Sequence, residues 1–415
     1  MVNLGKYLGS DCMRKIIELN LFLYIFSIYF YGVFPHMFFV TNLLGLLMFL
    51  NCLFYIILNR KKIKISPVVI WMFIFALISC LSIYKSIEQD VTFSIIRILF
   101  SIFLVCFATS IYVDSKEKIE NIIRYFIYCG FLLSIYALIS FDYSLLGLRR
   151  FDSAGNPNVV SILCVVSFIF GIYYFLAKKK YLVLLTWIPI LPVVILTASR
   201  KGTILIIFTI ILLIFLNNYN KNFAFIRSIL KIGILMVTTF FILNLTPLSE
   251  PMMTRMKNFV IDILNIEQVE DGSLNSRNLM IQKGIGYFTE KPILGHGLDQ
   301  FRVLFEKEPF GRRTYSHNNF VELLVSTGII GFLIYYSIYA YLFGIFVKYK
   351  LYKYFLCNIH LTLLAGLFLI GYGEVQYYDY KTYLLLIITN AVFQIYINSE
   401  RISRRGKRLV NLNIS

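Results

Sequence analysis

The chain has 415 residues, of which 59% are hydrophobic and only 15% are charged. A soluble core cannot bury this much apolar surface, so the composition excludes a soluble globular protein and predicts a polytopic membrane protein. The net charge of +18 at pH 7 is accounted for by membrane topology and by contact with anionic lipids, and we expect no nucleic-acid partner.

Long apolar stretches divide the chain. A helix that crosses the hydrocarbon of a bilayer needs about 20 apolar residues, and about twelve stretches approach this length. They lie near residues 16–34, 37–58, 67–84, 93–113, 122–141, 158–177, 181–198, 203–217, 228–246, 318–347, 355–373 and 381–397. We therefore predict an all-α polytopic fold with about twelve transmembrane helices, in a single integral membrane domain of residues 1–415.

Basic residues gather in alternate short loops between these stretches. The clusters lie at 60–64, 178–180, 221–231, 348–353 and 401–408. Positively charged short loops stay in the cytoplasm, and an even number of spans places all of these clusters on that side. Both termini are then predicted to be cytoplasmic.

The segments on the opposite, external side carry polar motifs, of which the first is the segment 149–158 between the fifth and sixth predicted spans. It reads Arg-Arg-Phe-Asp-Ser-Ala-Gly-Asn-Pro-Asn. Its glycine and proline predict a turn, and Asn158 can cap the helix that follows. The guanidinium groups of Arg149 and Arg150 offer forked donors. Turn chemistry alone would also explain the Gly-Asn-Pro-Asn part.

The tetrapeptide Ser-Arg-Lys-Gly at 199–202 separates the seventh and eighth predicted spans on the same side. Two cations between long apolar stretches are costly unless an anion or water meets them, so Arg200 and Lys201 are candidate functional residues. The alternative is that both side chains reach the phospholipid headgroups.

Residues 247–316 form an external loop between the ninth and tenth predicted spans that is too long for a simple connection. Its nine basic and nine acidic residues balance, unlike the cytoplasmic clusters. We expect helices within it, for instance near 276–289. Long ordered loops often carry function, and the loop contains Ser276-Arg277 and the Gly-His-Gly turn at 295–297.

The loop ends in Ser-His-Asn-Asn at 316–319, where the chain enters the tenth predicted span. Glu322 lies one turn inside this helix, so its carboxyl group can share a cavity with His317 and Asn318. A histidine at the start of a helix is most often a surface or capping residue. Here polar residues inside a membrane span favour a cavity over a lipid-facing position.

The sequence predicts neither a metal site nor a cofactor. Its seven cysteines show no CxxC spacing and none lies in the large loop, which also excludes a disulfide framework from the prediction. The HExxH and EF-hand patterns are missing as well.

Taken in order, the external motifs resemble the pattern of the O-antigen ligase and Wzy-type polymerase superfamily. They are Gly-Asn-Pro-Asn at 155–158, Ser-Arg-x-Gly at 199–202, Ser-Arg at 276–277 with Lys-Pro-Ile-Leu-Gly-x-Gly at 291–297, and Ser-His-Asn-Asn at 316–319 with Gly-x-x-Gly at 328–331. The resemblance covers residues 145–335, and the layout of spans extends it to the whole chain. Lys201 departs from the pattern, in which a small or aliphatic residue is common.

The resemblance implies a glycosyltransferase of the bacterial cytoplasmic membrane. Members transfer a sugar chain from a polyprenyl pyrophosphate to a hydroxyl, independently of metal, at the external face. By motif, His317, Arg200 and Arg277 match the functional residues of the family. The arginines would hold the pyrophosphate and stabilise its charge as it leaves, and His317 would act as a general base for attack with inversion. His296 is the alternative histidine.

The remaining polar residues receive supporting roles under the same resemblance. Arg149, Arg150 and Lys201 are expected to contact the pyrophosphate or the sugar. Asn318 and Glu322 are expected to orient the histidine or the acceptor.

Two activities fit the superfamily. A polymerase passes the growing glycan from undecaprenyl pyrophosphate to the next lipid-linked repeat unit of a capsule, exopolysaccharide or O-antigen, whereas a ligase delivers the finished chain to a terminal acceptor. We favour the polymerase, because the richness in Lys, Ile, Asn, Tyr and Phe is typical of an AT-rich bacterial genome. The expected partners are the undecaprenyl-pyrophosphate-linked oligosaccharide, membrane lipids, and a chain-length regulator and flippase of the same pathway. A lipid-linked oligosaccharide transporter is disfavoured, because the polar motifs gather on the external face and not at the midplane.

Overall fold

The computed structural model of the chain describes residues 2–34, 36–60, 63–145, 151–218, 272–309 and 311–412, together with five residues between 227 and 238. All regular secondary structure within these residues is helical, which confirms the predicted all-α class. The helices are α1 (Val2–Phe30), α2 (Met37–Asn59), α3 (Pro67–Leu81), α4 (Gln89–Tyr112), α5 (Lys116–Ser140), α6 (Pro157–Leu176), α7 (Leu184–Leu196), α8 (Arg200–Asn218), α11 (Gly272–Glu290), α12 (Phe301–Glu306), α13 (Asn319–Lys348), α14 (Phe355–Ile370) and α15 (Tyr380–Leu412).

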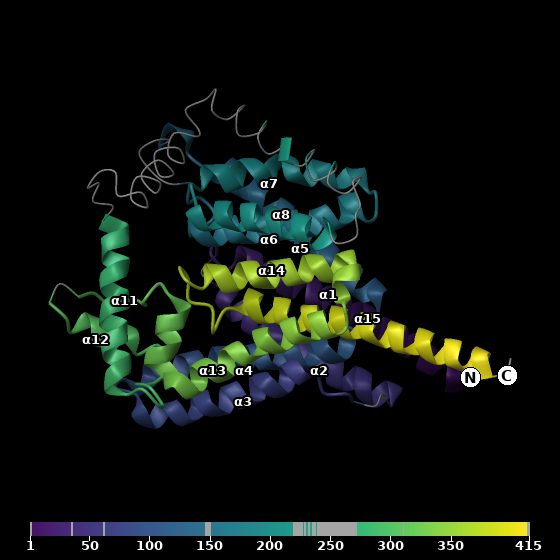
Figure 1. The fold of residues 1–415 in the computed structure, drawn as a ribbon, viewed down its shortest axis with the longest axis horizontal. Helices are drawn as coiled ribbons and strands as arrows, with labels where there is room; N and C mark the ends of the chain where they lie inside the picture. Colours follow the sequence, from purple (N-terminus) through teal and green to yellow (C-terminus); the bar gives the residue numbers. More distant parts are fainter. Residues whose placement is uncertain are drawn as a thin grey trace.

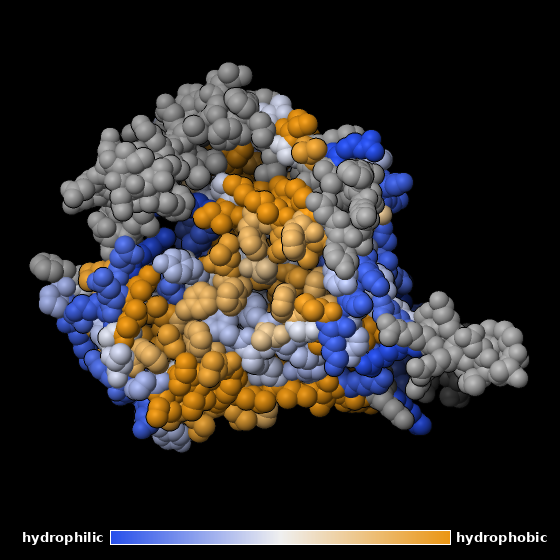
Figure 2. Space-filling model, in the orientation of Figure 1, coloured by the Kyte–Doolittle hydropathy of each residue, from blue (hydrophilic) through white to orange (hydrophobic). Residues whose placement is uncertain are grey.

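Most of these helices lie side by side in one bundle (Figure 1). The helices α11 and α12 lie at one end of the bundle, and the two chain termini lie together at the other end. Figure 2 shows a broad band of apolar side chains across the middle of the molecule, with hydrophilic side chains at both ends. This distribution is the one expected of a protein that crosses a bilayer.

Within the described residues, eight helices are long and apolar enough to span a membrane, judged by length and composition. They are α2, α3 with its 3-10 extension Ser82–Lys85, α4, α5, α6, α8, α13 and α15, while Tyr181–Leu196 and Phe355–Ile370 are shorter apolar helices. The predicted stretch 228–246 and the loop residues 247–271 fall largely outside the described residues. The count of about twelve spans and the side on which the termini lie therefore stay predictions.

The helix α6 packs against α5, α7, α8 and α14, and most of its side chains are buried. Small residues allow the neighbouring helices to come close. A Cβ atom added to Gly130 of α5 would lie 2.1 Å from the hydroxyl oxygen of Ser167, and one added to Gly202 of α8 would lie 1.9 Å from that of Ser161. The close approach of Gly202 to Ser161 brings the first turns of α6 and α8 together. The predicted motifs at 155–158 and 199–202 are therefore neighbours.

The helix predicted within the large loop is present as α11, and the turn that follows it packs against an interruption of α13. The helix breaks at Gly328, where φ is 62° and ψ is −166°. Such irregular backbone is tolerated in an apolar helix where protein covers it.

The turn after α11 lies close to this break. A Cβ on Gly295 would lie 2.5 Å from the backbone of Ser326, and one on Gly328 would lie 2.3 Å from that of Ile293. Backbone hydrogen bonds join the two segments, from His296 to Val325 (2.8 Å), from Gly297 to Ser326 (2.9 Å) and from Ile329 to Pro292 (2.8 Å).

Candidate active site

A cavity of about 710 Å³ opens at the end of the bundle that carries α11. Three distant parts of the chain form its walls, namely the segment that leads into α6, the first half of α11, and the segment between α12 and α13. The lining residues are Asp152, Gly155, Asn156, Pro157, Asn158, Ser276, Arg277, Met280, Arg312 and His317. The fold thus brings residues of three predicted motifs to one cavity.

The backbone conformation of His317 directs its ring into this cavity. Its φ of 56° is in the left-handed region, which residues with a side chain rarely adopt and which often marks functional sites. The imidazole packs on the ring of Tyr315, with 4.2 Å between the ring centroids. Within the described residues, no hydrogen bond ties either ring nitrogen to the protein, so the imidazole is available to a substrate.

Burial and nearby cations lower the pKa of His317 to about 4. The cations are Arg277, Lys201 and Arg312, and the carboxylate of Glu374 opposes them only in part. The imidazole is therefore neutral at pH 7 and can accept a proton.

The two asparagines that follow His317 hold the backbone in place. Oδ1 of Asn318 accepts hydrogen bonds from the backbone N–H groups of Phe320 and Val321 at 2.9 and 3.2 Å, and so caps α13. Oδ1 of Asn319 accepts from two backbone N–H groups in the loop between α14 and α15, at 2.7 and 3.0 Å. Asn318 is not among the residues that line the cavity, and its contacts are those of a helix cap.

Glu322 is fully buried one turn inside α13. Its Oε2 accepts a hydrogen bond from the backbone N–H of Ser316 at 2.8 Å, while its Oε1 has no hydrogen-bond partner among the described residues. The carboxyl group therefore holds the chain directly before His317.

The motif that begins at Ser199 lies beside the cavity at the start of α8. The hydroxyl group of Ser199 donates to Oδ1 of Asn158 in the cavity wall at 3.0 Å. Lys201 forms an ion pair with Glu374, with 3.1 Å between Nζ and Oε2. Arg200 is the partly buried first residue of α8 and is not among the residues that line the cavity.

Arg149 and Arg150 lie outside the described residues, but the turn that follows them forms one wall of the cavity. The predicted cap at Asn158 is wrong. The side chain of Asn156 caps α6, because its Oδ1 accepts a hydrogen bond from the N–H of Asn158 at 3.0 Å. Pro157 occupies the first helical position, which proline favours, and this places the cap on the residue before it.

His296, the alternative histidine, is 3% exposed and lies inside the turn that packs on α13. Its Nε2 is 2.8 Å from the carbonyl oxygen of Tyr287 in α11, and burial lowers its pKa. His296 is not among the residues that line the cavity, so we retain His317 as the candidate base.

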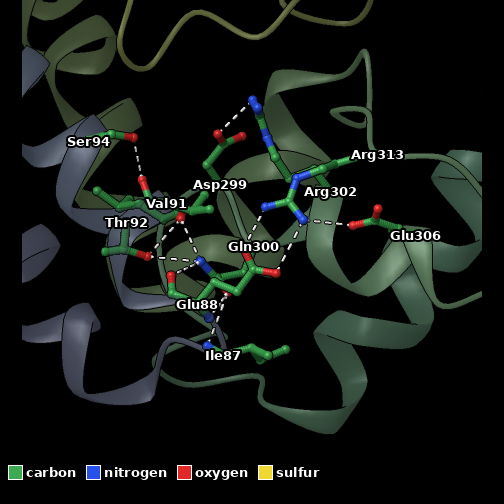
Figure 3. A network of polar contacts seen from close by, with 11 residues as sticks. Ile87, Glu88, Val91, Thr92, Ser94, Asp299, Gln300, Arg302, Glu306 and Arg313 are labelled. Carbon is green, nitrogen blue, oxygen red and sulfur yellow. Dashed lines mark hydrogen bonds and ion pairs between the residues drawn. The ribbon is translucent and has the colours of Figure 1, made fainter.

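Arg312 lines the cavity although sequence reasoning did not single it out. The neighbouring Arg313 turns away and forms ion pairs with Glu88 at the start of α4 and with Glu306 in α12 (Figure 3). Two adjacent arginines carry the same signal in a sequence, and only the fold shows which one faces the cavity.

Gln300 attaches α12 to the start of α4 (Figure 3). Its Oε1 accepts hydrogen bonds from the backbone N–H groups of Ile87 and Glu88 at 3.1 and 2.9 Å. Its Nε2 donates to the carbonyl oxygen of Glu88 at 2.9 Å and to the hydroxyl oxygen of Thr92 at 3.1 Å. These bonds fix the segment that ends in Arg312 against the bundle.

A family model described as O-antigen ligase (Wzy_C) matches residues 181–336. The matched range contains Arg200, Arg277, Arg312 and His317, and the cavity wall at 152–158 precedes it. No curated protein matches the chain.

Proposed function

We propose, from the premise that residues 181–336 form an O-antigen ligase family domain, that the protein is a polymerase of a bacterial surface polysaccharide. Members of this family are glycan-transferring membrane enzymes. The protein transfers the growing glycan from undecaprenyl pyrophosphate to the next lipid-linked repeat unit. The reaction takes place at the external face of the cytoplasmic membrane, at the end of the bundle that carries α11.

The observation that carries this proposal is the cavity that Arg277, Arg312 and His317 share. Arginine presents planar, forked donors that match the oxygens of a phosphate group, and it keeps its charge when it is partly desolvated. A neutral imidazole beside these groups can take a proton from an attacking hydroxyl. The set therefore supplies both an anion site and a base.

The start of α8 supports a pyrophosphate site next to this cavity. Arg200 and Lys201 are the first two residues of the helix. The positive end of the helix dipole disfavours a cation such as Lys201 unless an anion is near. Glu374 provides that anion for Lys201. We place the pyrophosphate within reach of Arg200, because the backbone N–H groups of a helix start also attract phosphate.

In the transfer step, the acceptor hydroxyl oxygen forms a bond to the anomeric carbon of the donor sugar, while the bond from that carbon to the pyrophosphate oxygen breaks. The electron pair of the broken bond stays on undecaprenyl pyrophosphate, whose added charge Arg200 and Arg277 stabilise. His317 accepts the proton of the hydroxyl group. Attack from the side opposite the leaving group inverts the anomeric configuration.

Donor binding strengthens the base in this scheme. In the free protein, burial and the surrounding cations hold the pKa of His317 at about 4, which makes it a weak base. A bound pyrophosphate compensates part of the positive charge of Arg277 and Arg312, so the pKa of His317 rises. The histidine then becomes an effective proton acceptor only when the donor is in place.

The other predicted residues act around this centre. Asn318 and Glu322 hold the segment that presents the histidine, and Lys201 adds positive charge at its side. The contact of Arg149 and Arg150 with the pyrophosphate or the sugar stays a prediction.

The experiment that tests the proposal is the electrophoretic profile of surface-attached and lipid-linked polysaccharide from cells with the wild type, a gene deletion, or His317→Ala at native level. A polymerase predicts that the ladder of chain lengths is lost and that single repeat units remain on the lipid carrier. Long chains that accumulate on the carrier would instead identify a ligase. An unchanged profile in the deletion would overturn both activities.

A further inference from the structure

A second cavity, of about 430 Å³, lies between α3, α4 and α15, away from the proposed active site. It is next to the N-terminal end of α3 and the C-terminal end of α4, whereas the opposite ends of these helices face Gly297 and Gln300. The cavity is thus at the end of the bundle that carries the chain termini. Nothing in the proposed transfer reaction uses it.

Polar groups line this cavity and one of them is buried without a complete set of partners. Asn390, Gln394 and Asn398 contribute side-chain amides at intervals of four residues along one face of α15. Asn390 is 3% exposed, and its Nδ2 donates to the hydroxyl oxygen of Ser66 at 3.0 Å. Its Oδ1 has no hydrogen-bond partner among the described residues. Because buried polar atoms are nearly always paired, this oxygen points to a ligand that carries a hydrogen-bond donor.

An apolar groove of about 280 Å³ between α3 and α13 continues from this cavity. Pro67 lines both hollows, and Nε2 of Gln394 in the cavity donates to the hydroxyl oxygen of Tyr341 in the groove at 3.4 Å. Ile70 and Ile74, which are about half exposed, form one side of the groove. Since α3 and α13 are candidate membrane spans, this groove faces hydrocarbon.

We propose that the cavity and the groove together bind one phospholipid of the surrounding bilayer. An acyl chain lies along the groove between α3 and α13, the phosphate meets the exposed cation Lys64 at the rim of the cavity, and a hydroxyl or ammonium group of the headgroup donates to Oδ1 of Asn390. Lys64 and Asp114 are the charged residues that line the cavity. A phospholipid is the occupant that matches an apolar groove joined to a polar pocket with a cation at its rim. This site does not depend on the proposed transferase activity.

Native mass spectrometry of the full-length protein, extracted in a mild detergent, tests the site by the phospholipid that stays bound. The variants are Asn390→Leu, which removes the acceptor, Lys64→Ala, which removes the cation, and Ser337→Trp, which fills the groove. Leu333→Trp is the matched control, because it puts the same indole on an exposed position of α13 that does not line the groove.

We expect one phospholipid on the wild type and on Leu333→Trp. Retention should fall by about fivefold or more in Asn390→Leu and in Lys64→Ala, which is the loss that one hydrogen bond or ion contact accounts for. It should also fall in Ser337→Trp, because the indole takes the place of the acyl chain. Lys64 is exposed, so its replacement reports on binding even if Asn390→Leu fails to fold. Equal retention in Lys64→Ala, Ser337→Trp and the wild type would overturn the proposal. A bound polyprenyl phosphate in place of a phospholipid would also overturn it.

Discussion

At the scale of single residues, the segment before α13 shows how one side chain is aimed. Asn318 caps the helix and Glu322 holds the backbone of Ser316, so the residue between them is forced into a left-handed conformation and cannot join the helix. This conformation costs on the order of 1–3 kcal/mol, and it persists only where the surrounding structure fixes it. The result is an imidazole that projects into the cavity with both nitrogens accessible to a substrate.

The pH dependence of turnover should report this imidazole. Because His317 acts only when neutral, activity is kept above its pKa and is lost as the pH falls through it. The pKa of about 4 places the acid limb of kcat/KM near pH 4. Donor binding raises the pKa, so the acid limb of kcat should lie at a higher pH than that of kcat/KM. The measurement is the initial rate with purified lipid-linked donor and acceptor across pH, with recovery of activity at pH 7 as the control for unfolding. Coincident limbs would contradict the predicted coupling between donor and base.

The adjacent pair Arg312 and Arg313 offers a matched test of the anion site. We expect Arg312→Gln to lower kcat/KM for the lipid-linked donor by roughly 10- to 100-fold, the loss of one hydrogen bond to a charged group. Arg313→Gln removes the same charge one residue later, but that side chain pairs with Glu88 and Glu306. Its kcat/KM should stay within about threefold of the wild type, since exposed ion pairs contribute little. Equal losses in both variants would mean that net charge, and not the cavity contact, matters.

At the scale of elements, the most consequential contact is the one between the turn after α11 and the break in α13. The turn provides donors to carbonyl groups that the break leaves free, and α13 provides a donor in return. The segment 312–318, which carries Arg312 and His317 of the cavity, is therefore held from both sides, by α12 before it and by the broken helix after it. This arrangement ties the external loop to the membrane bundle.

The glycine at the break is expected to be required. In Gly328→Ala the new Cβ would lie 2.3 Å from the backbone of Ile293 at a φ of 62°, and the strained backbone alone costs about 1–3 kcal/mol. The apparent unfolding temperature of the detergent-solubilised protein should fall, together with its activity. Gly344→Ala is the control on the same helix, because a Cβ there meets no atom within 4 Å and alanine favours helix by about 1 kcal/mol. If the two variants unfold at the same temperature, the contact between turn and break does not stabilise the fold.

At the scale of the whole molecule, the two ends of the bundle carry different parts of the chain. The termini share one end and α11 occupies the other, with an apolar band between them. The positive-inside distribution predicts that the end with the termini faces the cytoplasm.

Labelling of single cysteines should test this orientation. Cys12 of α1 is exposed near the chain termini, and Thr289 is exposed in α11 at the other end. With the remaining cysteines replaced, a membrane-impermeant maleimide should label Thr289→Cys in intact spheroplasts and should reach Cys12 only after lysis. The opposite pattern would invert the topology.

The length of the apolar stretches alone predicts most of the helix positions, because a transmembrane helix needs an unbroken run of mostly apolar residues. The stretch 318–347 is an example, since it becomes α13 with ends shifted by one residue. The break at Gly328 could not be predicted in the same way, because it depends on the turn at 292–297 and not on local pattern. The prediction of a helix near 276–289 in the loop is confirmed by α11.

The residues of the candidate site could be predicted only where they belong to a sequence motif. Arg277 and His317 were chosen by their motifs and share the cavity, and Arg200 lies close to it at the start of α8. The ion pair of Lys201 with Glu374 was not expected, because the two residues are 173 positions apart and no local rule joins them. Arg312 was missed for the same reason, since facing a cavity is a property of the fold.

The bond between Gln300 and the start of α4 joins residues 212 positions apart. A ribosome adds about 5–20 residues per second, so roughly 10–40 s pass between the synthesis of α4 and that of its partner. During this time the N–H groups of Ile87 and Glu88 lack the acceptor that Gln300 gives them in the folded protein. The start of α4 therefore receives these hydrogen bonds only after the chain up to α12 has been made.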